Sequence, residues 1–420
     1  MGERLITIGT GFLTTVLLAR YLGPEQFGIL SYAISLTAIF ASAGHMGLAG
    51  LVVREVVKFP ATKLETLGTS LLLKAAGMAA GFILIAGYAL IFENSSSLEF
   101  WILLVVSSAV LFQPFDVIDY WFQAQVQAKH TAIARSCATL LSAALKVALV
   151  ATGAGLMYFA FAHMIQAALG AVFLIVLYRY ATRHSILEWK ASLTRAGELL
   201  KQGWIIYLGS IFAVIYIKID QVMLKWLVGA EEVGVYSVAA QLSEAWYFVP
   251  TAIVASFFPK LIELHAANNK LFNDRLQQIF DFLFILALAV SIAVSLIAQP
   301  LISAFFGDSY IEAAPILSIH IWAGIFIFMR ALFSRWILIE NALMFSLITQ
   351  GLGALANILL NLLLIPKYGG EGAAVATLLS YSIASYGALF FHKKTRPIFY
   401  MMTKSILSPL RYPLAYARRK

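Results

Sequence analysis

Long apolar segments alternate with short polar stretches along the whole chain. A helix that crosses a bilayer needs about 20 mostly apolar residues, at a rise of about 1.5 Å each. Twelve segments approach or exceed this length, and they cover residues 5–22, 27–49, 64–92, 98–122, 131–152, 156–180, 204–228, 233–257, 276–298, 313–337, 342–365 and 372–392. We therefore expect twelve membrane-spanning helices. The first is the shortest and begins almost at Met1, so the natural start could lie upstream.

A polar turn motif occurs twice, each time between two of these segments. Residues 23–28 read GPEQFG, and residues 229–234 read GAEEVG. Identities continue at the same offset, at Ser31 and Ser237, Ala33 and Ala239, and Leu36 and Leu242. The repeated unit is thus helix, tight turn, helix. With six spans in each half, we expect two pseudo-symmetric six-helix lobes around a central cavity, and a binding site between the repeats.

The spans also set the predicted boundaries of the parts. The N-terminal lobe covers residues 1–180, and the C-terminal lobe covers residues 204–392. The linker between them, 181–203, carries mixed charges at helical spacing and predicts a surface helix. The tail, 393–420, alternates cations with apolar side chains, which is typical of a segment that lies in the headgroup layer of an anionic leaflet.

Composition places the chain among all-α integral membrane proteins. Hydrophobic residues make up 61% of it and charged residues only 12%, which no ordinary soluble domain approaches. The single cysteine, Cys137, excludes an intrachain disulfide. The net charge of +9 would suggest nucleic acid in a soluble protein, but here its distribution over the loops is the informative feature, and we expect no nucleic-acid partner.

The loop cations predict the orientation in the membrane. If both termini and the even-numbered loops share one side, that side holds 23 of the 30 lysines and arginines, Arg135 among them. The other side holds Arg20, Lys225 and Lys367. Cytoplasmic loops carry the excess of such residues, so we expect a multi-pass membrane protein with both termini in the cytoplasm.

Ionisable residues within the predicted spans are the best candidates for function, because they are costly there and usually face a cavity or a partner. Four are cations: Lys74, Lys146, Lys218 and Arg330. We interpret them as a cationic cavity for an anionic headgroup; the alternative is structural pairing with intramembrane acids, or side chains that extend to the interface. Lys218 and Asp220 cannot pair directly, because residues two apart point about 200° from one another on a helix.

The fourth predicted span carries a polar stripe. Its members recur every three or four residues, namely Gln113, Asp116, Tyr120, Gln123 and Gln127. With Asp119 they could line a path for a hydroxyl-rich ligand or water, and Tyr120 could stack on a sugar ring, although an interfacial aromatic belt explains it equally. Pro114 in the fourth span and Pro250 in the eighth predict helix kinks.

No motif for an enzyme or a resident cofactor stands out. Metal-ligand spacings, nucleotide-binding loops and nucleophile elbows are not found in the sequence. We therefore expect no catalytic residues, no metal and no cofactor. If transport is coupled to a proton or sodium gradient, protonation of Asp116, Asp220 or Glu244 is a candidate coupling step.

Five motifs give the chain a family resemblance. They are residues 19–28 (ARYLGPEQFG), 114–124 (PFDVIDYWFQA), 218–224 (KIDQVML), 357–361 (NILLN) and 365–374 (IPKYGGEGAA). Over essentially its whole length the chain resembles the Wzx-type oligosaccharide-lipid flippases of bacterial polysaccharide export. Their superfamily also holds multidrug and peptidoglycan-precursor exporters.

This resemblance implies a function by alternating access. The implied cargo is an undecaprenyl-diphosphate-linked oligosaccharide, moved from the inner to the outer leaflet for O-antigen (lipopolysaccharide) or capsule assembly. The family's cationic lumen maps onto Lys74, Lys146, Lys218 and Arg330. Implied partners are membrane lipids, a polysaccharide polymerase and a chain-length regulator. The rival interpretations are a multidrug antiporter, a lipid II flippase of the same fold and, less favoured, a membrane glycan polymerase or ligase.

Overall fold

The computed structural model describes residues 2–340 and 342–409, and within them every regular element is a helix. The chain divides into two compact units, residues 1–222 and 223–420. Ten helical stretches of the described residues are long and apolar enough to cross a membrane. Two of these stretches are broken, Gly9–Lys58 at Gly23 and Leu343–Phe391 at Gly369, so each supplies two crossings. The twelve predicted spans are therefore present.

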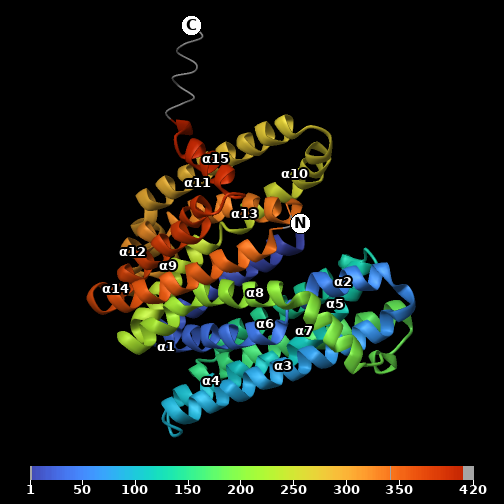
Figure 1. Ribbon diagram of the computed structural model, residues 1–420. Coiled ribbons are helices and arrows are strands. Elements are labelled where there is room, and N and C mark those ends of the chain that lie inside the picture. The colour runs from blue at the N-terminus through green and yellow to red at the C-terminus, as the bar shows by residue number, and fades with distance from the viewer. Residues whose placement is uncertain (1, 341, 410–420) are drawn as a thin grey trace. The chain divides into compact units, whose positions relative to one another are not determined.

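The first unit is a bundle of long helices joined by short 3₁₀ turns. Its helices are α1 (Gly2–His45), α2 (Leu48–Lys58), α3 (Lys63–Phe92), α4 (Leu98–Ser108), α5 (Val117–Ala124), α6 (Ala128–Ala151), α7 (Leu156–Thr182) and α8 (Leu193–Leu227), with 3₁₀ turns η1 (Pro60–Thr62), η2 (Ala109–Asp116) and η3 (Ile186–Glu188). Within this unit α1 packs along α3 and α6, and α6 packs along α7 (Figure 1).

The second unit has the same helical character. Its helices are α9 (Ala230–Glu244), α10 (Phe248–Ala267), α11 (Asn269–Phe306), α12 (Ala313–His320), α13 (Ala323–Ile339), α14 (Leu343–Ser385) and α15 (Arg396–Ile406), with 3₁₀ turns η4 (Asp308–Tyr310) and η5 (Gly387–Phe391). In the apolar core of this unit, α11 packs against α13 through four fully buried side chains, Phe280, Leu283, Met329 and Phe333. The lobe boundaries predicted from the sequence stay a prediction.

The repeated motif forms a tight turn in each unit, as predicted. Gly23 has φ +73° and ψ 172°, and Gly229 has φ +143° and ψ 178°, conformations that only glycine adopts without strain. Both turns are tied to a second turn of the same unit. The Tyr21 hydroxyl donates to the Ala154 carbonyl oxygen at 3.0 Å, and Glu232 Oε1 accepts from the Gly370 N–H at 2.5 Å.

The fourth predicted span is broken rather than continuous. It consists of α4, the 3₁₀ turn η2 that contains Pro114, and α5. The predicted kink at Pro114 is therefore present, and the eighth span is broken at 245–247, with Pro250 in the first turn of α10 that follows. The predicted stripe is wrong at its end, because α5 stops at Ala124 and leaves Gln127 exposed in the turn before α6.

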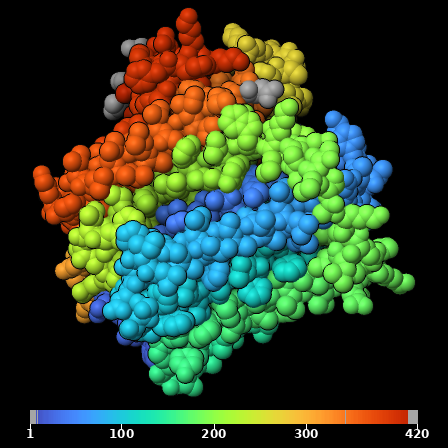
Figure 2. All heavy atoms as spheres, turned by 60° about the horizontal axis from the view of Figure 1, so that its bottom comes forward, coloured from blue at the N-terminus to red at the C-terminus, as the bar shows by residue number. Residues whose placement is uncertain are grey.

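The linker is not a continuous surface helix. Between α7 and α8 only the short η3 is helical, and α8 begins at Leu193. The Lys190 carbonyl lies so close to Gly68 that an added Cβ would approach its oxygen to 2.2 Å. Arg195 reaches Glu55 at 2.7 Å, so the linker is fixed to the ends of α2 and α3, where green residues border blue ones in Figure 2.

The tail also departs from its prediction. Helix α15 packs against α11 (Figure 1) and buries Ile398 and Met402, so its apolar face meets protein. Asp281 of α11 is only 3% exposed and accepts a hydrogen bond from the Ser405 hydroxyl of α15 at 2.7 Å. The pairing joins residues 124 positions apart, a relation that no local pattern reveals. Residues 410–420 of the predicted tail lie outside the described residues.

The turn geometry predicts the effect of adding a methyl group to either repeated glycine. Gly23→Ala and Gly229→Ala should each lower stability by about 1–3 kcal/mol, because the Cβ is strained at these dihedral angles. Thermal unfolding of the purified protein in detergent measures this. Gly87→Ala is the control, since Gly87 lies inside α3 with open space around an added Cβ, and should be neutral or slightly stabilising. Equal melting temperatures for all three variants would contradict the assignment.

Candidate functional site

A lysine without solvent exposure is the centre of the polar cluster in the first unit. The side chain of Lys74, on α3, has 0% exposure. Its ammonium lies 3.5 Å from Asp116 Oδ2 and donates to the Tyr120 hydroxyl at 3.3 Å. A buried charge needs such partners, because the interior solvates it poorly. The break in the fourth span makes this contact possible, since it directs Asp116 from the end of η2 toward α3.

Arg135 of α6 completes the cluster. Its guanidinium lies 3.0 Å from Asp119 Oδ2 and 3.8 Å from Asp116 Oδ1, and Gln123 Nε2 donates to Asp119 Oδ2 at 3.1 Å. Asp116 is thus shared by Lys74 and Arg135, and two cations balance two carboxylates. The predicted surface position of Arg135 stays a prediction, and its side chain is 47% exposed while it makes these contacts. In the sequence, Arg135 lies inside the fifth predicted span, directly after the span that contains Asp116 and Asp119. This position was the one indication of the contact.

One amide of the predicted stripe is buried without a partner. Among the described residues none hydrogen bonds to Oε1 of Gln113. A buried acceptor left unpaired is costly, so such an atom is suited to a hydroxyl donor that arrives with a ligand. Gln123, by contrast, is exposed and oriented by Asp119.

Lys146 lies on the same helix as Arg135 but has a different environment. Its ammonium donates to the Gln166 side-chain oxygen at 3.2 Å, and the Ser142 hydroxyl donates to that oxygen at 3.1 Å. Within residues 2–340 and 342–409, no carboxylate pairs with Lys146. Eleven residues at about 100° each bring Lys146 to the face of Arg135, about 16 Å further along α6. This face therefore carries one balanced cation and one cation held by an amide.

The remaining candidates lie on other helices. Lys218 is half-buried on α8, and Asp220 is buried beside Gln221, which accepts a hydrogen bond from the Ser35 hydroxyl. Glu244 is half-buried at the end of α9 in the second unit. Buried Arg330, on α13, donates to the Ala384 carbonyl oxygen at 3.4 Å and, in the described part of the chain, contacts no carboxylate. The structure thus joins Lys74 with the fourth-span residues and leaves Lys146 and Arg330 with neutral partners.

A family model described as "Polysaccharide biosynthesis protein" matches residues 3–265, more than half of the chain. The chain belongs to this polysaccharide biosynthesis family. It is 24% identical over 396 residues to a probable flippase, AglR, of Haloferax volcanii, across 91% of this chain and 80% of that protein. The sequence resemblance to Wzx-type flippases is thereby confirmed at the level of the family.

Two solved structures show the fold of this family member. The lipid II flippase MurJ in an inward closed conformation has a TM-score of 0.74 at 16% identity, covering 98% of this chain and 92% of MurJ. An inward-facing multidrug resistance transporter of the MATE family scores 0.70 at 13% identity, covering 96% of each chain. The predicted fold class, an all-α membrane protein with twelve spanning helices in two six-helix lobes, is confirmed. The protein is a multi-pass membrane protein of the polysaccharide biosynthesis family.

The charge balance in this family member predicts a coupling between two side chains. Asp116→Asn should destabilise the protein by about 3 kcal/mol, because the buried Lys74 ammonium loses its nearest carboxylate. Adding Lys74→Met should recover part of this loss, since no unpaired cation remains. A double-mutant cycle of thermal unfolding measures the coupling. Strictly additive losses would show that the two side chains do not depend on one another.

Proposed function

We propose that this protein flips an undecaprenyl-diphosphate-linked oligosaccharide from the inner to the outer leaflet of the bacterial plasma membrane, by alternating access, for surface polysaccharide biosynthesis. The family and the transporter fold support a lipid-linked cargo. The observation that carries the proposal is the ammonium of Lys146, which lies within a span and is held by the Gln166 amide. An intramembrane cation with a neutral partner is suited to an anionic ligand group.

In the proposed mechanism the diphosphate enters from the cytoplasmic side and passes along the cationic side chains. Its charge is neutralised by the four predicted cations, Lys74, Lys146, Lys218 and Arg330. Arg135, which shares Asp116 with Lys74, is a fifth cation of this path. In a site of low dielectric each such contact is stronger than in water. The polyprenyl chain stays in the lipid, so only the headgroup and the glycan need a polar path.

The glycan is assigned to the polar residues of the fourth span and its neighbours. Gln113 offers a buried acceptor without a partner, and Gln123 and Asp119 offer further hydrogen-bonding groups. Tyr120 is engaged by Lys74, with the ammonium 5.4 Å from its ring centre, so stacking on a sugar would have to share the ring with that cation.

Asp116 supplies a route to energy coupling. A proton on Asp116 would remove the carboxylate that pairs with Lys74, while Arg135 would keep Asp119. The Lys74 ammonium could then bind the diphosphate, and departure of the diphosphate would favour loss of the proton. Asp220 and Glu244 remain alternative coupling sites in this proposal, and sodium an alternative ion.

The proposal predicts a loss of surface polysaccharide when two cations are removed. Lys146→Ala combined with Lys218→Ala should abolish polysaccharide export at normal protein abundance, because the diphosphate loses its counter-charges. The readouts are surface polysaccharide and the lipid-linked oligosaccharide that accumulates in cells.

The matched control removes two cations that the structure leaves exposed. Lys58→Ala with Lys201→Ala changes the net charge equally and should leave export unchanged. Normal export in the Lys146 and Lys218 double variant would reject the cation assignment. Uptake of cationic dyes by the purified protein, without effect on the lipid-linked oligosaccharide, would instead favour a multidrug antiporter.

A further inference from the structure

A groove lies in the hairpin of α10 and α11 in the second unit, away from every candidate residue above. Only Asn268 separates these two helices, and its side-chain oxygen accepts from the Leu271 N–H at 3.0 Å. The groove has a volume of about 420 Å³. Pockets that hold small molecules have volumes of about 300–1,000 Å³, so the groove has room for part of a ligand.

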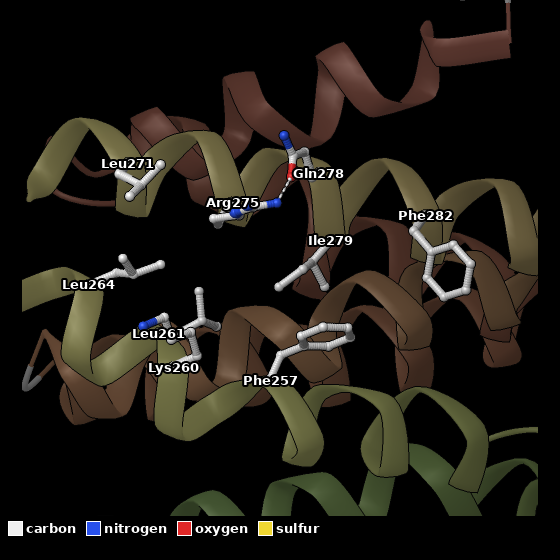
Figure 3. A pocket seen from close by; sticks show the side chains of 9 residues that line it. All are labelled: Phe257, Lys260, Leu261, Leu264, Leu271, Arg275, Gln278, Ile279 and Phe282. Atoms are coloured by element: carbon white, nitrogen blue, oxygen red, sulfur yellow. Dashed lines mark hydrogen bonds between the residues drawn. The ribbon is translucent and has the colours of Figure 1, made fainter.

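The half of the groove nearer the hairpin turn holds both of its cations, beside Leu261, Leu264 and Leu271, and the other half is apolar. Figure 3 shows Lys260 of α10 and Arg275 of α11 on its two walls, in the half nearer the turn. Phe257, Ile279 and Phe282 line the other half. From Arg275 to Phe282 the helix rises about 10 Å. Two cations flanked by apolar side chains, with aromatic rings about 10 Å along the groove, match an amphiphile with an anionic group better than a uniformly polar ligand.

Lys260 and Arg275 each keep N–H groups that can donate to a ligand. In the described part of the chain, the groove lining contains both cations and no carboxylate. Lys260 contacts Glu263 at 2.7 Å, but both side chains are mostly exposed, so water screens this pair and the ammonium keeps further hydrogens. Arg275 donates one N–H to Gln278 at 2.8 Å and retains its other donors. An anionic group between them would meet charge of the opposite sign on both walls.

The apolar half indicates where the ligand comes from. Phe257 and Phe282 are about half exposed, at 48% and 52%, and both lie in segments apolar enough to cross the membrane. Side chains at such positions face lipid, so the surrounding bilayer supplies the occupant directly. A free phosphate ion would use the cations but leave the apolar half unfilled.

We propose that this groove binds an anionic phospholipid, with its phosphate between Lys260 and Arg275 and an acyl chain along Phe257, Ile279 and Phe282. The positions of the cations near the turn match the headgroup layer of the adjacent leaflet, where basic side chains attract anionic over zwitterionic lipids. The bound lipid would hold α10 and α11 together at their open face. This site is separate from the cargo path and does not rest on the proposed function.

The test measures lipid binding to the purified full-length protein. Phosphatidylglycerol, phosphatidylcholine and soluble glycerol 3-phosphate are added separately to the protein in neutral detergent, and bound lipid is counted by native mass spectrometry alongside thermal unfolding. We expect retention and stabilisation by phosphatidylglycerol, weak effects of phosphatidylcholine and none of glycerol 3-phosphate. Lys260→Gln with Arg275→Gln should weaken phosphatidylglycerol binding about tenfold while leaving the melting temperature without added lipid unchanged.

The control is a second pair of exposed cations in the same unit that does not line the groove. Lys270→Gln with Lys404→Gln makes the same change of charge and should leave binding unaltered. Equal weakening by both pairs would overturn the proposal in favour of diffuse surface charge. So would equal binding of the two phospholipids, protection by glycerol 3-phosphate alone, or displacement of the phospholipid by the lipid-linked oligosaccharide.

Discussion

The polar cluster of the first unit depends on how the charge of one fully buried lysine is balanced. Lys74 is inaccessible to solvent and must be compensated within the protein, which Asp116 and Tyr120 do. Pro114 lies in the 3₁₀ turn η2, which ends at Asp116, the carboxylate that Lys74 and Arg135 share. The need for charge balance also explains Arg135, because two carboxylates beside one ammonium would leave excess negative charge.

The candidate cations are of two kinds, according to whether their partners are carboxylates or neutral groups. Lys74 and Arg135 are both balanced by carboxylates. Among the described residues Lys74 pairs with Asp116 alone, so its charge becomes available if Asp116 is neutralised, whereas Arg135 keeps Asp119 at 3.0 Å. Lys146 and Arg330 contact an amide and a backbone carbonyl, so their charge is available already. For the doubly charged headgroup of the proposed cargo, the cations with neutral partners would supply attraction, and Lys74 would bind and release it as Asp116 gains and loses a proton.

Hydropathy predicted the twelve spans because the bilayer imposes one length on every crossing, and the repeat located the Gly23 and Gly229 turns because their dihedral angles require glycine. Features that depend on distant contacts were missed. The sequence did not predict the pairing of Arg135 with Asp119, since only the packing of α5 against α6 brings these side chains together. The burial of Asp281 likewise depends on Ser405, and the linker follows the ends of α2 and α3 rather than its own helical spacing.

The most direct test of the account is the affinity of the purified protein, in lipid nanodiscs, for a polyprenyl diphosphate compared with the matching monophosphate. The account predicts tighter binding of the diphosphate, and a loss of about tenfold or more in Lys146→Gln that Lys146→Arg largely restores. Equal affinity for the two lipids, or undiminished diphosphate binding by Lys146→Gln, would contradict the claim that intramembrane cations recognise the cargo.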